Sequence, residues 1–281
     1  MNATPLLEVP LLFETADGTT HAPLVIATIH GRQVPFIVDT GMSGHLLTME
    51  MAAELRIEGE PGEEGTDSTG SSVPSWSLGE VPVQIGPGWF TLEDVAGIAA
   101  PPPFLRMGIG GGISPQQLHA TAWAVMDLRN DTLVLLDGEQ PIDEWLRMRH
   151  PELRHVVLGR VLDDEGILLV SLAVAGYEPV TTLLDTGGKG TEVLASVVPG
   201  LTGGELRSTG HGVGGTEAFG RDVAGQALEV DGSRVPVERL ILRDEMGGGY
   251  QILVGMDTLR GGVLAVSHDQ QRPVHWLFPA D

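Results

Sequence analysis

The sequence predicts an all-β protein built from two related lobes. Glycine accounts for 39 of the 281 residues and proline for 19, which indicates many turns and argues against a bundle of helices. Apolar stretches of strand length alternate with these turn signals. The strongest observation is an internal repeat, in which strand, turn, strand and Asp-Thr-Gly follow one another over residues 24–41 and again over residues 168–187.

Three anchors recur in the same order in the two copies. The first is the aspartate of Asp-Thr-Gly, at Asp39 and Asp185, 146 residues apart. An apolar-Gly element follows each aspartate by about 70 residues, and each element is followed by a strand, an acidic turn and another strand. These last segments cover residues 123–133 and 263–274. Three anchors at one spacing predict a duplicated module.

The segment between the two copies carries neither repeat and marks the domain boundary. We predict an N-terminal lobe, a linker and a C-terminal lobe over residues 1–140, 141–151 and 152–281. Short helices are expected at residues 47–55 with Ser43 as cap, at residues 115–119 and at residues 145–149.

Composition excludes several classes of function. The formal net charge is −22, which disfavours a nucleic-acid or anionic-membrane partner because phosphate is repelled. The chain has no cysteine, so zinc-thiolate sites, iron–sulfur clusters and a cysteine nucleophile are excluded. No apolar run is long enough to span a membrane, and residues 1–7 do not resemble a secretory signal, so a cytoplasmic location is expected.

The duplicated Asp-Thr-Gly turns carry the predicted chemistry. In each copy an apolar strand ends at the aspartate, and a glycine then allows close backbone approach. Pseudo-twofold symmetry would bring Asp39 and Asp185 face to face. Two carboxylates at about 3 Å share one proton, so one can deprotonate a water while the other protonates a carbonyl oxygen.

These motifs resemble the aspartic peptidases, and the lengths of the lobes resemble two fused retropepsin-like units of the bacterial type. The resemblance covers nearly the whole chain and implies a bilobal acid-protease fold, in which two pseudo-symmetric, β-barrel-like lobes enclose a peptide-binding cleft. It implies that Asp39 and Asp185 are the catalytic dyad. It also implies that the reaction needs no metal or other cofactor. It also assigns supporting roles to the remaining motif residues: cross-lobe hydrogen bonds to Thr40 and Thr186, the shape of the turns to Gly41 and Gly187, and packing behind the turns to Ile109, Gly110, Val254 and Gly255.

The sequence departs from the family at the residue after each Asp-Thr-Gly. Alanine or serine is usual there, whereas this chain has Met42 and Gly188. Neither tyrosine, Tyr177 or Tyr250, occupies the position of a pepsin-type flap tyrosine. Glycine-rich hairpins are therefore the candidate lids. The residues concerned are Ser68, Thr69, Gly70 and Ser71 in the first lobe and His211, Gly212, Val213, Gly214 and Gly215 in the second.

Other reactive residues fit ordinary structural roles better. Lys189, the only lysine, is expected to point to solvent, and His45 and His211 to be satisfied or exposed rather than catalytic. His150 and His155 lack metal-ligand spacing, and Ser43 is not in a nucleophile elbow, because Gly-x-Ser-x-Gly fails at His45. The glycine-rich run at residues 108–113 does not fit a dinucleotide-binding fingerprint, because position 113 is isoleucine. Trp76, Trp89 and Phe90 are predicted to be core or cleft wall.

The leading hypothesis is a monomeric aspartic endopeptidase that acts on a peptide or protein, since one chain supplies both lobes. One alternative keeps the fold and uses the aspartate pair in a dedicated precursor-processing or biosynthetic enzyme, including non-proteolytic acid–base chemistry. Another is a catalytically inactive peptide-binding module, which the two intact Asp-Thr-Gly motifs disfavour.

Overall fold

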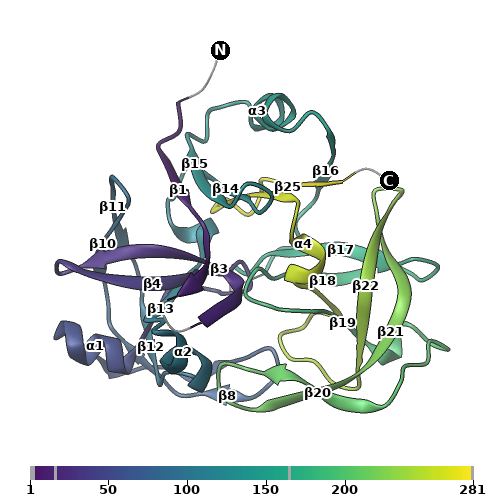
Figure 1. The fold of residues 1–281 in the computed structure, drawn as a ribbon, viewed down its shortest axis with the longest axis horizontal. Helices are drawn as coiled ribbons and strands as arrows, with labels where there is room; N and C mark the ends of the chain where they lie inside the picture. Colours follow the sequence, from purple (N-terminus) through teal and green to yellow (C-terminus); the bar gives the residue numbers. More distant parts are fainter. Residues whose placement is uncertain (1–3, 16–17, 164–165, 280–281) are drawn as a thin grey trace.

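The computed structural model describes residues 4–15, 18–163 and 166–279 (Figure 1). Within these ranges short strands dominate and form three large sheets and one small hairpin, with only short helices between them. The all-β prediction is confirmed.

A six-stranded sheet joins the two halves of the chain in the order β1-β15-β14-β24-β25-β16. Its centre is the antiparallel pair of β14 and β24, where Val125 lies opposite Ala265. Each repeat ends in a hairpin, β14–β15 in the first and β24–β25 in the second. These two hairpins therefore pair with each other about a pseudo-twofold axis. The strands are β1 (Leu7–Pro10), β14 (Trp123–Asp127), β15 (Thr132–Leu136), β16 (Leu153–Leu158), β24 (Val263–Ser267) and β25 (Val274–Pro279).

The other two large sheets each belong to one half of the chain. The N-terminal sheet contains β2 (Leu12–Thr15), β3 (Gly18–Ile29), β4 (Arg32–Val38), β5 (Leu46–Thr48), β6 (Glu60–Pro61), β9 (Ser75–Ser77), β10 (Val81–Ile85), β11 (Gly88–Leu92), β12 (Ala96–Ile98) and β13 (Gly111–Ile113). The small hairpin is β7 (Gly65–Thr66) with β8 (Ser72–Val73). The C-terminal sheet contains β17 (Leu169–Val174), β18 (Val180–Leu184), β19 (Thr191–Leu194), β20 (Leu206–His211), β21 (Glu217–Val230), β22 (Ser233–Arg243) and β23 (Ile252–Val254).

The β3–β4 hairpin shows how the sequence positions the first aspartate. Its two-residue turn, His30-Gly31, has positive φ at both residues (49° and 80°), the conformation that matches the twist of a hairpin. After the turn, the inner residues of β4 are buried, and the strand ends at Val38. Val38 and its counterpart Leu184 belong to one continuous apolar core, so a rigid element delivers each aspartate.

The helices differ in detail from those expected. They are α1 (Met49–Leu55), α2 (Pro102–Met107), α3 (Ile142–Arg149) and α4 (Met256–Leu259), with 3-10 turns at Pro115–Gln117 and Ala195–Val197. The cap of α1 is Thr48, whose hydroxyl accepts from the Met51 amide at 3.2 Å, so Ser43 is the wrong cap and residues 47–48 belong to β5. The prediction for residues 115–119 is corrected to one 3-10 turn.

Candidate active site

Asp39 and Asp185 lie at equivalent strand ends and face each other across the lobes. Asp39 follows β4 and its amide donates to the Ile113 carbonyl at 2.9 Å, while the Asp185 amide after β18 donates to the Val254 carbonyl at 3.0 Å. The two carboxyl groups hydrogen-bond to each other. The structure therefore brings together the pair that the repeat predicted.

One supporting residue pair predicted from the sequence is out of register. The parallel partner of β4 is β13, with Ile113 opposite Val38, so the counterpart of Val254-Gly255 is Ile113-Ser114 rather than Ile109-Gly110. Ile109 instead packs in a small separate apolar cluster at the edge of the lobe. The search for an apolar-Gly pair pointed to Ile109-Gly110, whereas strand pairing places Ile113-Ser114, a pair without glycine, behind the aspartate.

The two threonines of the motifs hold the turns together reciprocally. The Thr40 hydroxyl donates to the Leu184 carbonyl at 2.6 Å and accepts from the Thr186 amide at 3.0 Å. The Thr186 hydroxyl donates to the Val38 carbonyl at 2.8 Å and accepts from the Thr40 amide at 3.1 Å. Both side chains are fully buried, so these hydrogen bonds fix the relative position of the turns without competition from water.

Burial raises the pKa values of both aspartates. Burial raises the pKa of Asp39, and hydrogen bonds from Asp185 and from the amides of Gly41 and Gly187 oppose that rise. Burial also raises the pKa of Asp185, and there the Asp39 charge and the hydrogen bond to Asp39 add to the rise, so the pKa lies well above its ordinary value. The arrangement favours a single proton shared by the two carboxyl groups, which titrate as a pair.

The glycines of the second turn leave room for the carboxylates. A Cβ on Gly187 would lie 2.2 Å from Asp39 Oδ2, and a Cβ on Gly188 would lie 2.7 Å from Asp185 Oδ2. The amides of both glycines donate to Asp185 Oδ1 at 2.8 Å. The departure from the family at Gly188 thus has a local reason, because a side chain there would press on the carboxylate.

A buried amide side chain that the sequence analysis missed supports the first turn. Gln116 donates through Nε2 to the carbonyls of Thr40 and Met42, at 3.2 and 3.3 Å, and the Ser114 hydroxyl also donates to Met42 at 3.1 Å. The signal in the sequence was the polar pair Gln116-Gln117, shortly after β13. It was overlooked because the sequence analysis placed Ile109-Gly110 behind the aspartate. The unusual Met42 therefore contributes its backbone carbonyl to this network.

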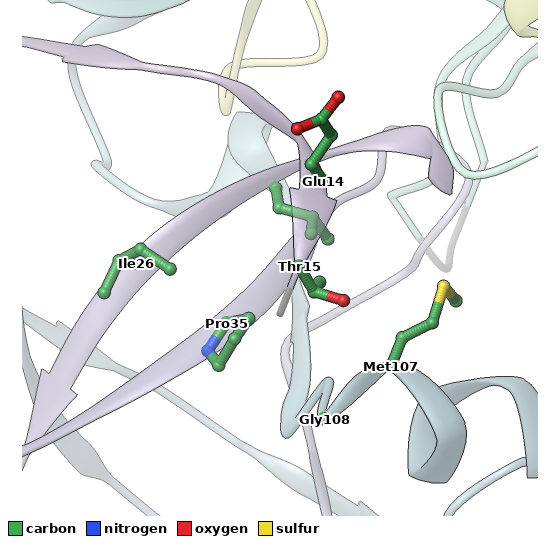
Figure 2. Close-up of a pocket in the computed structure, with 7 residues that line it drawn as sticks. Glu14, Thr15, Ile26, Pro35, Met107 and Gly108 are labelled. Atoms are coloured by element: carbon green, nitrogen blue, oxygen red, sulfur yellow. The ribbon is translucent and has the colours of Figure 1, made fainter. Parts of the chain in front are cut away.

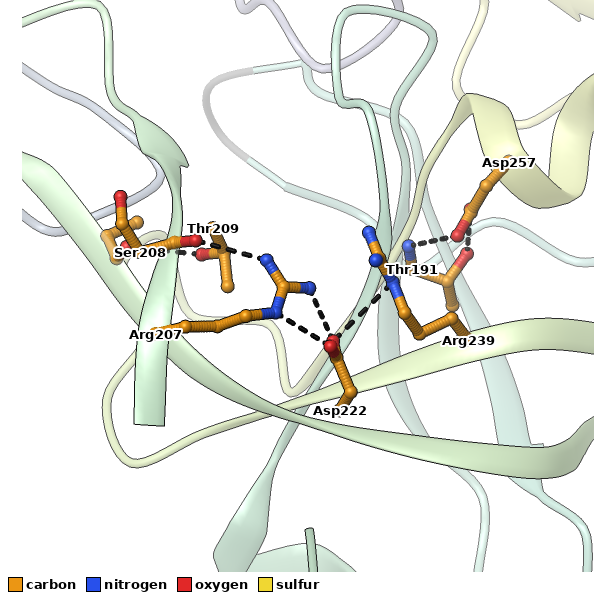
Figure 3. Close-up of polar contacts among 8 residues, drawn as sticks. Thr191, Arg207, Ser208, Thr209, Asp222, Arg239 and Asp257 are labelled. Carbon is orange, nitrogen blue, oxygen red and sulfur yellow. Dashed lines mark hydrogen bonds and ion pairs between the residues drawn. The ribbon is translucent and has the colours of Figure 1, made fainter. Parts of the chain in front are cut away.

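A different device supports the second turn (Figure 3). The Thr191 amide and hydroxyl both donate to the Asp257 carboxylate, at 3.1 and 2.7 Å, and the same hydroxyl accepts from the Gly255 amide at 3.3 Å. The amide of Met256 donates to the Gly188 carbonyl at 2.8 Å. Sequence reasoning also missed His21, whose Nε2 lies 2.9 Å from the Gly187 carbonyl and so links β3 to the opposite turn.

The candidate lids meet each other through a buried carboxylate. Asp67 Oδ1 accepts from the Thr69 amide, the Thr69 hydroxyl and the Ser71 amide, at 2.9, 2.5 and 3.2 Å. Asp67 Oδ2 accepts from the Gly214 amide at 3.1 Å, across the lobes. The Gly247 amide also donates to the Ser68 carbonyl at 3.2 Å. The structure thus brings the two predicted lid segments into direct contact.

Charged side chains of β20, β21 and β22 support the candidate lid of the second lobe. Arg207 on β20 forms two hydrogen bonds to Asp222 on β21, at 2.7 and 2.5 Å, and Arg239 on β22 lies 3.5 Å from the same carboxylate (Figure 3). Of the predicted lid residues there, Gly212 is buried against Asp67, whereas His211, Val213, Gly214 and Gly215 are exposed.

The remaining candidates fall outside the dyad. Lys189 is exposed, as expected, and His211 is exposed at the end of β20. His45 is buried, and burial lowers its pKa to about 4 against an opposing hydrogen bond with the Gln117 backbone.

Trp89 is 72% exposed, so its prediction as core or cleft wall is wrong; it lies on β11, where nothing covers it among the described residues. Tyr250 is buried, and burial together with the charges of Asp185, Glu192 and Asp67 raises its pKa.

A hollow of about 390 Å³ lies elsewhere on the first lobe (Figure 2). It is lined by Glu14, Thr15, Leu24, Ile26, Pro35, Met107 and Gly108, from β2, β3, β4 and the end of α2. Because it includes no dyad or lid residue, it has no part in the site described above.

Fold and site together define a bilobal protein of the aspartic protease class. Residues 25–116, which contain the first Asp-Thr-Gly, match the family described as aspartyl protease. This match confirms the predicted resemblance to the aspartic proteases. No helix in the described ranges has the length and apolar character needed to cross a membrane.

Solved structures share the fold over almost the full length. Basic 7S globulin from soybean matches with a TM-score of 0.52 and 11% identity, covering 96% of this chain and 94% of that one. Conglutin gamma, a basic 7S globulin from lupine seeds, matches with a TM-score of 0.51 and 11% identity, covering 97% and 95%. At this identity the likeness establishes the pepsin-like bilobal fold alone. The comparison with curated proteins returned no match.

Proposed function

We propose that the protein is an aspartic endopeptidase in which Asp39 and Asp185 activate one water molecule for attack on a peptide bond. The observation that carries this proposal is the hydrogen-bonded carboxyl pair with raised pKa values, held by the Thr40–Thr186 contacts. A dyad that served only as a structural turn would not need two buried acids in contact, because each could cap its own turn alone.

The shared proton divides the roles between the two acids. The ionised member accepts a proton from the water as it attacks the carbonyl carbon, and the protonated member donates its proton to the carbonyl oxygen. When the tetrahedral intermediate collapses, the first acid passes its proton to the leaving nitrogen and the second takes back a hydroxyl proton, which releases two peptides. No covalent bond to the enzyme forms in this sequence.

The lids support an extended peptide as substrate. They meet through Asp67 and Gly214, so a peptide entering between the lobes would part this contact and pair with the freed backbone groups. Both aspartates and both lids come from one chain, so we propose a monomer as the active form.

The test compares the wild type, Asp39→Asn and a matched control, Asp94→Asn, on a diverse peptide pool from acidic to neutral pH. Asp94 is an exposed turn residue with φ 48°, a conformation that asparagine also adopts, so its variant should cleave like the wild type. We expect mass spectrometry to show cuts by the wild type and the control that are absent with Asp39→Asn. Absence of cleavage by a folded wild type at every pH, or retention of the cuts by Asp39→Asn, would overturn the proposal.

A further inference from the structure

Three side chains with metal-binding atoms converge on the six-stranded sheet, outside the candidate active site. His155 lies on β16 and His275 on β25, and Asp143 lies in the first turn of α3, which covers them. In the register of β16 and β25, His155 is opposite Leu277, so His275 is its diagonal neighbour on the same face. Helix α3 is at the top of Figure 1, whereas β8 and β20, which adjoin the lids, are at the bottom.

The three atoms that face one another have the spacing of ligands around one small cation. His155 Nε2 lies 3.1 Å from His275 Nδ1. Asp143 Oδ1 lies 3.2 Å from His275 Nδ1 and 3.6 Å from His155 Nε2. Tetrahedral zinc with bonds of about 2.0–2.1 Å places its ligand atoms about 3.3 Å apart, which matches this triangle.

Protons alone satisfy the cluster poorly. His275 Nδ1 lies within hydrogen-bond distance of both His155 Nε2 and Asp143 Oδ1, but a single ring nitrogen carries at most one proton to share between them. A cation at the centre would contact all three atoms at once. The convergence of two imidazole nitrogens and a carboxylate oxygen on one point is the observation that points to an ion rather than to a simple hydrogen-bond network.

We propose that Asp143, His155 and His275 form a binding site for a divalent transition-metal ion of the zinc class. Imidazole ligands select zinc and its transition-metal neighbours over calcium and magnesium, which prefer oxygen. The two imidazole side chains are 6% and 3% exposed, whereas the Asp143 side chain is 48% exposed, so the ion has a route of entry and a water can supply the fourth ligand. The ion would link α3, the helix between the lobes, to β16 and β25 of the sheet that both lobes share.

The experiment uses the full chain after removal of metals with a chelator, titrated with Co²⁺ or Zn²⁺. We expect one Co²⁺ per chain, with the visible absorption bands of tetrahedral cobalt, and a rise in Tm with Zn²⁺. Asp143→Ala should weaken binding at least tenfold. The matched control is Glu144→Gln, which removes the neighbouring exposed charge of α3 but no ligand and should bind like the wild type.

A substitution of Arg147 provides a second variant, with the opposite expected effect on metal affinity. Its charge acts on both His155 and His275, so Arg147→Gln should tighten metal binding by removing a nearby cation. Absence of cobalt bands in the folded wild type would overturn the proposal. Equal binding by Asp143→Ala and Glu144→Gln would also overturn it, because the ion would then lie at another site. The result is independent of whether the protein cleaves peptides.

Discussion

The Asp67 carboxylate of the first lobe accepts a hydrogen bond from the Gly214 amide of the second lobe at 3.1 Å, between residues 147 positions apart. A Cβ at Gly212 would lie 1.9 Å from Asp67 Oδ2, the oxygen that accepts this bond. A glycine at position 212 therefore allows the two segments to lie this close. The contact joins the two candidate lids directly.

Asp67→Asn is predicted to loosen this lid contact. If the asparagine carbonyl keeps the bonds from Thr69 and Ser71, its NH₂ group faces the Gly214 amide, and two donors then oppose each other. Loss of one bond to a charged acceptor corresponds to roughly tenfold faster hydrogen exchange at the Gly214 amide. Glu63→Gln, an exposed change nearby, should leave the rate unaltered. An unchanged rate in Asp67→Asn would show that the contact does not hold the lids.

Thr40→Val should destabilise the fold through the cross-lobe contact. It leaves the Leu184 carbonyl and the Thr186 amide buried without their partners, which costs about 2–4 kcal/mol of unfolding free energy. Urea unfolding measures the loss, and Thr40→Ser should recover most of it. Thr182→Val is the control, since that buried hydroxyl donates only to the nearby Val180 carbonyl and its removal should cost about 1 kcal/mol. Equal losses at the two sites would contradict a special role for the cross-lobe pair.

Gly187→Ala is expected to abolish peptide cleavage while the chain still folds. The new methyl group would lie 2.2 Å from Asp39 Oδ2 and displace the carboxylate. A misplacement of about 1 Å in a catalytic group costs on the order of 10²-fold in rate. Gly159→Ala, at a position with no atom within 4 Å, should retain full activity. Comparable kcat/KM for Gly187→Ala and the wild type would refute the placement of the dyad.

Asp185 should make the protein less stable as pH rises. Its pKa is raised in the folded state, so its stabilising effect is full below the ordinary value of 3.8 and is lost as pH rises through the higher folded value. Asp185→Asn mimics the protonated acid at every pH. Unfolding free energies of the two proteins should therefore converge below pH 3.8 and diverge above it, with the variant the more stable. A wild type that gains stability relative to Asp185→Asn with rising pH would contradict this sign.

The amino-acid sequence was sufficient to predict the duplicated architecture and the reactive pair. Asp39 and Asp185 could be predicted because a repeated module packs about a twofold axis, which places equivalent strand ends together. The reciprocal contacts of Thr40 and Thr186 were an implication of the resemblance to the aspartic peptidases, and the structure shows them. The architecture and the aspartate pair are consequences of local pattern combined with duplication.

The features that differ between the two lobes could be recognised only in the folded protein. Ile113, rather than Ile109, lies behind the first aspartate because strand register depends on pairing across the sheet. Gln116 and Asp257 support the two turns in different ways, and no repeat could predict that difference. Asp143, His155 and His275 are far apart in the chain, with no motif spacing, and the packing of α3 on β16 and β25 brings them together. Sequence patterns report local periodicity, whereas contacts between distant side chains exist only once the core has fixed their positions.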